Sequence, residues 1–311
     1  MEICVVGTGV IGTIYGAVLA ESGSAVTHLV RPGGASRLDH GVEVELLDAR
    51  LGQVRERRIA YQPQTVDHLE PGRFELVLAS VHHNQVADLL PTLAAAGGDV
   101  ALFNNWWDTF APVEAHLAGR YTWAFPVAGG GFDGRRLHAA LLDHVVVSGD
   151  QRQAGACSER VAQLFTGSDL SVERPPDMLT WLWVHFATEA GIIAAAIKTG
   201  DVAAFLDNID ALTEGVLGVR DALAVVAARG VDPWQRPEAQ MFLADAGEVA
   251  AGIRTIYQVD RAARLIMERH TGGDDLSRIY RDVTATGREL GVAMPVLAAL
   301  GQYVEAYAAA S

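Results

Sequence analysis

The feature of this sequence that most constrains its fold is a glycine-rich turn, "GTGVIG", between a β-branched run and a helical pattern. The run "MEICVV" predicts a strand, "TIYGAVLAES" a helix and "AVTHLVR" a second strand, which together make a βαβ unit. In such a unit Gly7 permits the tight turn, Gly9 lets a phosphate approach the backbone, and Gly12 lets helix and strand pack closely. The helix N-terminus presents unpaired N–H groups, so we expect a dinucleotide site. Its expected contact residues are Gly7, Thr8, Gly9, Val10, Ile11 and Gly12.

The second predicted strand closes with an arginine, in "LVRPGG". An NAD enzyme presents an Asp or Glu to the ribose hydroxyls at this place. The guanidinium of Arg31 instead offers a fork of donors suited to a 2′-phosphate, and each charge-assisted bond is worth about 1.5–3 kcal/mol. We therefore expect NADPH (NADP) as the cofactor. The alternative is that Arg31 is a solvated loop residue.

Strand signals recur at "FELVLASV", "DVALFNN" and "HVVVSGD", and they stop after the Pro175–Pro176 pair. This pattern predicts an α/β fold: a doubly wound, mostly parallel sheet in residues 1–170 and an all-helical domain in residues 171–311. The helices of the second part are expected at 178–198, 202–229, 235–268 with breaks, 274–290 and 296–309. The glycine-rich stretch "AGGGFDGRR", Ala128 to Arg136, is expected to be a flexible loop.

Composition narrows the class of partner. A formal net charge of −14 leaves no basic patch for nucleic acid or an anionic membrane, so we expect a small-molecule substrate. Two cysteines, Cys4 and Cys157, are too few for a disulfide framework, and no export leader is visible, so we expect a cytoplasmic location. The histidines and cysteines show no metal-ligand spacing, so no metal is expected.

The most apolar stretch, "LTWLWVHFATEAGIIAAAI" at residues 179–197, contains His185 and Glu189. It is long enough to cross a bilayer, but each ionisable group at its middle would cost several kcal/mol there. We therefore expect a buried helix of the second domain. Residues i and i+4 are neighbours on a helix, so the imidazole and the carboxylate should meet on one face.

Several motifs together resemble the ketopantoate reductase (2-dehydropantoate 2-reductase) family. They are "MEICVVGTGVIGTIYGAVLAESG", the arginine closing the second strand, "LASVHHNQV", "LFNN" and "GRELGVAMP". The resemblance implies a Rossmann domain, a helical domain like that of 6-phosphogluconate dehydrogenase, and reduction of a 2-oxo acid by NADPH in the cleft between them. A homodimer is the assembly we expect. The family's asparagine, which helps hold nicotinamide and substrate, falls on Asn105; its cofactor-side lysine falls on His82, a departure.

The resemblance also locates the chemistry. His185 stands where the family has its proton-donating lysine, and Glu189 where it has an asparagine. The chain's single lysine, Lys198, lies 13 residues after His185, roughly 220° around the helix. An imidazolium can protonate the alkoxide formed by hydride transfer, and a nearby carboxylate can orient the ring. We expect His185 to be the proton donor. The alternative is that His185 and Glu189 only form a buried polar pair with each other in the core.

Two further features bear on the substrate. The family's second acid falls on Asp275 in "GGDDLSRIYRD", which also fits an ordinary helix N-cap. Trp106 and Trp107 in "NNWWDTF" replace a small turn of the family and would add bulk beside the nicotinamide, so a substrate other than ketopantoate is expected. The leading hypothesis is an NADPH-dependent reductase of a small, 2-oxo acid-like carbonyl compound. The alternatives are imine reduction or opine-type reductive condensation, and a catalytically inactive NADPH-binding protein.

Overall fold

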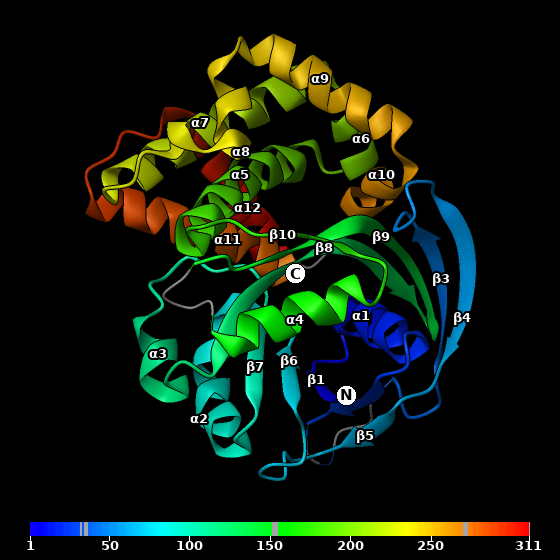
Figure 1. Ribbon diagram of the computed structural model, residues 1–311. Helices are drawn as coiled ribbons and strands as arrows, with labels where there is room; N and C mark the ends of the chain where they lie inside the picture. Colours follow the sequence, from blue (N-terminus) through cyan, green and yellow to red (C-terminus); the bar gives the residue numbers. More distant parts are fainter. Residues whose placement is uncertain (32, 34–36, 151–154, 270–272, 311) are drawn as a thin grey trace. The chain divides into compact units, whose positions relative to one another are not determined.

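The computed structural model describes residues 1–31, 33, 37–150, 155–269 and 273–310, with only the backbone for 273–275. The described chain divides into two compact units (Figure 1). The first contains residues 1–178 and 265–270, and the second contains residues 179–264 and 271–311. The first unit is α/β and the second is helical, so the predicted fold class is confirmed.

The first unit is built on one ten-stranded sheet, with the strand order β4-β3-β9-β8-β7-β6-β1-β2-β5 and β10 paired to β9. The strands are β1 (Glu2–Val6), β2 (Ala25–Leu29), β3 (Val42–Asp48), β4 (Arg55–Tyr61), β5 (Gln64–Val66), β6 (Leu76–Ala79), β7 (Asp99–Phe103), β8 (Tyr121–Asp133), β9 (Arg136–Val147) and β10 (Ser171–Glu173). In the half of the sheet with the order β8-β7-β6-β1-β2-β5, every neighbouring pair of strands is parallel. The β3–β4 and β8–β9 pairs are antiparallel, so the sheet is mixed but mainly parallel.

Helices fill the connections of the first unit. They are α1 (Val10–Glu21), the short 3₁₀ helix η1 (His83–Gln85), α2 (Val86–Ala96), α3 (Ala111–Leu117) and α4 (Ala156–Thr166). The strands β1, β6 and β7 are continuous apolar runs with buried side chains, as expected for parallel strands covered on both faces. α1 and α4 share one core over the sheet, where the Tyr15 ring meets Phe103 at 4.6 Å and Phe165 at 5.8 Å.

The expected flexible loop at 128–136 is wrong. β8 runs to Asp133 and β9 begins at Arg136, so most of this stretch is a strand hairpin. Gly130 has φ of 157°, and a Cβ there would lie against the carbonyl oxygen of His138 on the opposite strand. Gly130 therefore allows a close approach of the two backbones.

The sheet also continues past residue 170. β10 pairs with β9 in parallel, with Val172 opposite Val145, and the first compact unit reaches Met178. The assignment of 1–170 to cofactor binding and 171–311 to substrate binding and dimerisation stays a prediction.

The second unit consists of helices that lie close to the predicted ranges, but the helix predicted at 202–229 is divided at Asn208 into two. They are α5 (Met178–Thr199), α6 (Val202–Asp207), α7 (Ile209–Ala228), η2 (Pro233–Gln235), α8 (Pro237–Gln240), η3 (Met241–Leu243), α9 (Ala246–Val259), α10 (Arg261–Glu268), α11 (Gly273–Glu289) and α12 (Pro295–Ala310), with the end of α10 in the first unit. Among the described residues, α5 is the one helix long and apolar enough to cross a membrane, but 72% of its most apolar window is buried. It has the burial of a core helix.

Two glycines let α5 and α7 cross at close range. A Cβ on Gly191 of α5 would lie against the backbone nitrogen of Val219 in α7, and one on Gly218 would lie 3.3 Å from the Gly191 Cα. Backbone atoms of two packed helices cannot move aside as a flexible side chain can. The crossing therefore depends on the absence of a side chain at Gly191.

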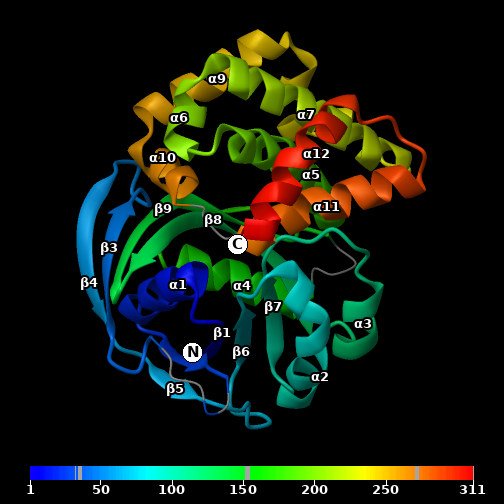
Figure 2. The ribbon, with the colours of Figure 1, turned by 180° about the vertical axis from the view of Figure 1, so that it is seen from behind.

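The sheet curls around α1, so that strands far apart in the strand order meet. In both ribbon views α1 lies between the β3–β4 pair and β1 (Figures 1 and 2). Tyr61 ends β4 at one edge of the sheet, and His28 lies on β2 near the other edge. The Tyr61 hydroxyl and His28 Nε2 are nevertheless 2.9 Å apart, in a buried hydrogen bond. Burial lowers the pKa of His28 to about 4, and its bond to the Gly7 carbonyl opposes this shift only in part.

We predict that Gly191→Ala lowers the free energy of unfolding by about 1–3 kcal/mol, because the new methyl group overpacks the α5–α7 crossing. Chemical denaturation checks this. Gly252→Ala in α9 is the matched control: a Cβ there meets nothing within 4 Å, so the same substitution should stabilise by about 0.5–1 kcal/mol through helix propensity. Equal effects of the two substitutions would contradict the close crossing.

We also predict acid sensitivity from His28. Its pKa is about 4 in the folded chain against the ordinary 6.5, so between these values the unfolded chain binds a proton that the folded chain does not. The free energy of unfolding should thus fall by roughly 3 kcal/mol as the pH drops from 6.5 to 4. His28→Leu removes this contribution, and urea unfolding at several pH values measures the difference. Parallel pH profiles for the two proteins would argue against a buried neutral imidazole.

Candidate functional site

The predicted cofactor residues of the first unit gather at one edge of the sheet. β7, β6, β1 and β2 are consecutive and parallel, so the segments that follow them leave the sheet at the same, carboxyl edge. Ligands of open α/β sheets bind at this edge. The segments are the glycine-rich turn after β1, Arg31 after β2, His82 after β6, and Asn104 and Asn105 after β7.

The glycine-rich turn has the geometry that a phosphate site needs. Gly7 has φ of 114°, and a Cβ there would lie against the carbonyl oxygen of Ser80. A Cβ on Gly12 would lie 2.7 Å from the Gly7 carbonyl oxygen, so close packing of α1 on the turn requires glycine here too. The three residues of the turn that are not glycine, Thr8, Val10 and Ile11, are half-buried.

The space in front of this helix end is open. Gly9 is exposed, and a Cβ there would meet nothing within 4 Å. Among the described residues no side chain caps the N-terminus of α1, and its first turn contains no acidic residue. The backbone N–H groups at this helix end are therefore left without a side-chain acceptor, and the turn fits a bound pyrophosphate.

Arg31 is exposed and lies just beyond the end of β2. The backbone N–H of Val30 donates to the Val66 carbonyl at 2.8 Å, which holds the chain in the sheet up to this point. Arg31 thus reaches solvent from a fixed strand end. Its role toward a 2′-phosphate stays a prediction.

His82 is the residue that precedes η1. Its carbonyl oxygen accepts the Gln85 N–H at 2.9 Å, and its own N–H donates to Gln85 Oε1 at 3.2 Å. The residue is exposed. The backbone of His82 is therefore fixed at the start of η1, and a cofactor contact by its side chain stays a prediction.

Of the two asparagines after β7, Asn105 is half-buried, and its Oδ1 accepts the N–H of Trp106 at 3.0 Å. Asn104, one residue closer to the strand, is only 6% exposed, and its Nδ2 donates to the Val81 carbonyl at 3.1 Å. Its Oδ1 is buried without a hydrogen-bond partner among the described residues. A buried acceptor without a donor is costly, so Asn104 is a candidate site residue that the sequence analysis missed. Counting from the last residue of the strand would have identified it.

The first of the two neighbouring tryptophans packs inward. The Trp106 ring lies 5.1 Å from that of Trp123, and its Nε1 donates to the Thr109 carbonyl at 3.2 Å. Phe110 stacks on the same Trp123 ring at 4.5 Å. The bulk of Trp106 therefore fills the interior of the first unit.

In the second unit, α5 brings His185 and Glu189 together as their spacing predicts. Their Nε2 and Oε1 atoms are 3.3 Å apart, and the side chains are 31% and 22% exposed. The Trp181 ring stacks on the imidazole with centroids 5.2 Å apart and an interplanar angle of 5°. The ring is thus stacked on its face and lies beside a carboxylate at its edge, while its side chain is partly accessible.

Two other predicted positions have simpler outcomes. Lys198 is paired with Glu214, at 2.7 Å between Nζ and Oε2, and this bond raises the pKa of its ammonium. Lys198 is therefore a surface ion-pair residue. Asp275 lies in the first turn of α11, and its side chain lies outside the described residues. No group of three potential metal ligands occurs in the described part of the chain.

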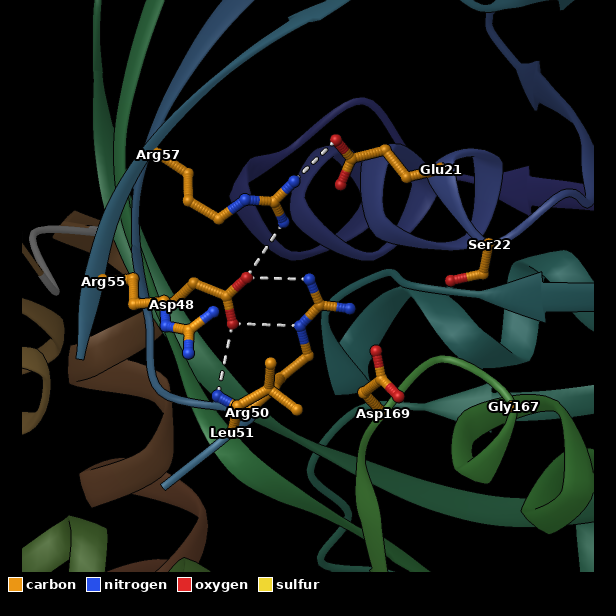
Figure 3. A pocket seen from close by; sticks show the side chains of 9 residues that line it. All are labelled: Glu21, Ser22, Asp48, Arg50, Leu51, Arg55, Arg57, Gly167 and Asp169. Carbon is orange, nitrogen blue, oxygen red and sulfur yellow. Dashed lines mark hydrogen bonds and ion pairs between the residues drawn. The ribbon is translucent and has the colours of Figure 1, made fainter. Parts of the chain in front are cut away.

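A pocket of about 630 Å³ in the first unit lies at the other end of α1 (Figure 3). Asp48 accepts from Arg50 at 2.7 Å and from Arg57 at 3.0 Å, and Arg57 also pairs with Glu21 at 2.9 Å. These bonds tie β3 and β4 to the end of α1. The charges of this network are matched, so it stabilises the fold and leaves the glycine-rich turn as the better cofactor site.

Comparisons with known proteins agree with this architecture. Solved structures cover almost the whole chain. One is the ternary structure of D-mandelate dehydrogenase with NADH and anilino(oxo)acetate, at 15% identity over 100% of this chain and 99% of that chain, with a TM-score of 0.72. Another is 2-dehydropantoate 2-reductase from Geobacter metallireducens GS-15, at 16% identity over 98% and 99%, with a TM-score of 0.72. A third is the dimeric ketopantoate reductase from Staphylococcus aureus, at 14% identity over 100% and 99%, with a TM-score of 0.68.

At these identities the solved structures establish the shared fold. No curated protein matches the chain. The family model "Ketopantoate reductase PanE/ApbA" matches residues 3–124, which include the glycine-rich turn, Arg31, His82 and both asparagines after β7. The resemblance is confirmed over residues 3–124, which match the family model of the PanE/ApbA ketopantoate reductases.

Proposed function

We propose that this protein is an NADPH-dependent reductase of a small 2-oxo acid other than ketopantoate, with His185 as the proton donor. The observation that carries the proposal is the uncapped N-terminus of α1 behind a glycine-rich turn, within the residues that match the ketopantoate reductase family model. D-mandelate dehydrogenase has a similar fold and was solved with NADH and anilino(oxo)acetate, which supports reduction of an oxo acid by a nicotinamide cofactor.

Bound NADPH would supply the hydride that reduces the carbonyl carbon. The chain's residues would do the rest. The N–H groups of the turn would bind the pyrophosphate, Arg31 would bind the 2′-phosphate, and the amides of Asn104 and Asn105 would orient the groups bound at the end of β7. The imidazolium of His185 would give a proton to the developing alkoxide. Glu189, beside the ring edge, and Trp181, on the ring face, would orient the imidazole.

The experiment that tests this function is NADPH oxidation by the purified protein with a panel of 2-oxo acids, including ketopantoate, with and without added amines. Turnover of oxo acids alone, with ketopantoate among the poorest substrates, is the expected result. Turnover that requires an amine would identify an imine or opine-type reductase. Tight NADPH binding without turnover of any member would identify a cofactor-binding protein without catalysis and overturn the proposal.

For the cofactor, we predict that NADPH binds at least about tenfold more tightly than NADH, because the Arg31 guanidinium pairs with the 2′-phosphate. Arg31→Ala should remove this preference by weakening NADPH binding alone. Titration of both cofactors measures it. Arg55→Ala is the control, since Arg55 is also exposed but lines the pocket at the other end of α1. Equal affinities of the wild type for the two cofactors would refute the role of Arg31.

For catalysis, we predict that His185→Ala lowers kcat by about 10²–10⁴-fold, the usual contribution of a positioned acid, with little change in NADPH affinity. Glu189→Gln should act in the same direction but more weakly, because it loosens the ring orientation. Steady-state kinetics and NADPH titration on the same preparations measure both effects.

The matched control for this prediction is His144→Ala. His144 also pairs with a carboxylate, at 2.9 Å from Asp143, and its side chain is 26% exposed, but it lies on β9. This variant should keep the wild-type kcat. If His185 only satisfies Glu189, His185→Ala will lower the melting temperature and leave kcat unchanged, and the catalytic assignment fails.

A further inference from the structure

A chain of two hydrogen bonds runs from the glycine-rich turn to the end of β4. The His28 Nδ1 lies 2.9 Å from the carbonyl oxygen of Gly7, and the His28 Nε2 lies 2.9 Å from the Tyr61 hydroxyl. A carbonyl can only accept, so Nδ1 carries the hydrogen. In the neutral ring Nε2 is then an acceptor, and the Tyr61 hydroxyl donates to it.

Burial keeps the His28 ring neutral, which fixes the direction of both hydrogen bonds. His28 is fully buried and Tyr61 is 5% exposed, and burial lowers the pKa of His28 to about 4, so the ring is neutral at ordinary pH. α1 makes room for the hydrogen bond: a Cβ on Gly16 would lie 2.5 Å from the Tyr61 oxygen and 2.7 Å from His28 Nε2. Gly16 on α1, His28 on β2 and Tyr61 on β4 thus fit against one another.

The His28–Tyr61 pair contacts the candidate phosphate site through the Gly7 carbonyl. In a planar trans peptide the C=O and the following N–H point in opposite directions. A Gly7 carbonyl held toward His28 therefore turns the Thr8 N–H to the other side of the turn. The same carbonyl lies under α1, 2.7 Å from the Cβ position of Gly12, so its direction is also coupled to the first turn of that helix.

We infer that His28 and Tyr61 are positioning residues for the pyrophosphate of the bound dinucleotide, acting through the Gly7 carbonyl and the Thr8 N–H. The inference rests on the proposed cofactor binding and adds residues that touch no part of the cofactor themselves. It couples the β3–β4 hairpin, through Tyr61, to the turn after β1. A histidine that only forms hydrogen bonds in the core would contribute to folding stability, and its replacement would not change the affinity for the cofactor.

The test is the dissociation constant for NADPH, with NADH in parallel, measured by titration together with the melting temperature. His28→Leu leaves the Gly7 carbonyl without its donor and should weaken binding on the order of tenfold. Tyr61→Phe leaves the His28 ring less firmly held and should weaken binding about threefold. His28→Asn should recover much of the loss, because its amide nitrogen can take the place of Nδ1 as the donor.

The matched control is Tyr15→Phe. It also removes a buried hydroxyl from the first unit, one whose hydrogen-bond partner lies not in the turn but on β8, where it accepts the Val127 N–H at 3.1 Å. It should lower the melting temperature and keep the NADPH affinity. If Tyr61→Phe and His28→Leu behave like this control, the inference is overturned. If His28→Leu does not fold, Tyr61→Phe and His28→Asn decide in the same way.

The wild type separates this inference from the function on which it rests. A wild type that binds neither NADPH nor NADH refutes the proposed function, and the positioning role with it. A wild type that binds cofactor, with unchanged affinity in the folded His28 and Tyr61 variants, refutes the positioning role alone.

Discussion

The first unit depends on one short contact, between the Gly7 carbonyl and the start of α1 at Gly12. It sets how closely α1 lies on the sheet, and with that the place of the helix N-terminus at the carboxyl edge. The Tyr15 contacts with Phe103 and Phe165 follow from the same placement of α1. Any side chain at Gly12 would separate helix and turn, so the core of the unit and the shape of its candidate phosphate site depend on the same contact.

The sequence predicted the elements whose signals are local. β1, β6 and β7 are buried on both faces and therefore appear as continuous apolar runs, and α5 is a long apolar helix bounded by prolines before it. The His185–Glu189 pair could also be predicted, because residues i and i+4 meet on any helix. The glycine-rich turn was readable because its backbone requirements specify the residue types directly.

Other features depend on contacts between distant residues and could not be predicted. β4 has the sequence "RERRIAY", which is charged because the strand lies at an edge, so it lacks an apolar signal. The run of glycines in β8 suggested a loop. The reason for a glycine there, the close approach of the opposite strand, cannot be seen in the sequence of β8 alone. His28 and Tyr61 are 33 residues apart, and only the curl of the sheet brings them together. Asn104 was passed over because the resemblance places the family's asparagine on its neighbour, and the buried Oδ1 of Asn104 shows only in the folded chain.

The two ends of the sheet bear on how copies of this chain could associate. β5, at one end, is only three residues long, and β4, at the other, carries Arg55, Glu56, Arg57 and Arg58 in succession. Adding a strand from a second molecule to β4 would bring these charges against a neighbour and remove water from them. Growth of the sheet from molecule to molecule is therefore disfavoured at both ends of this strand order, which favours association of subunits through side-chain surfaces.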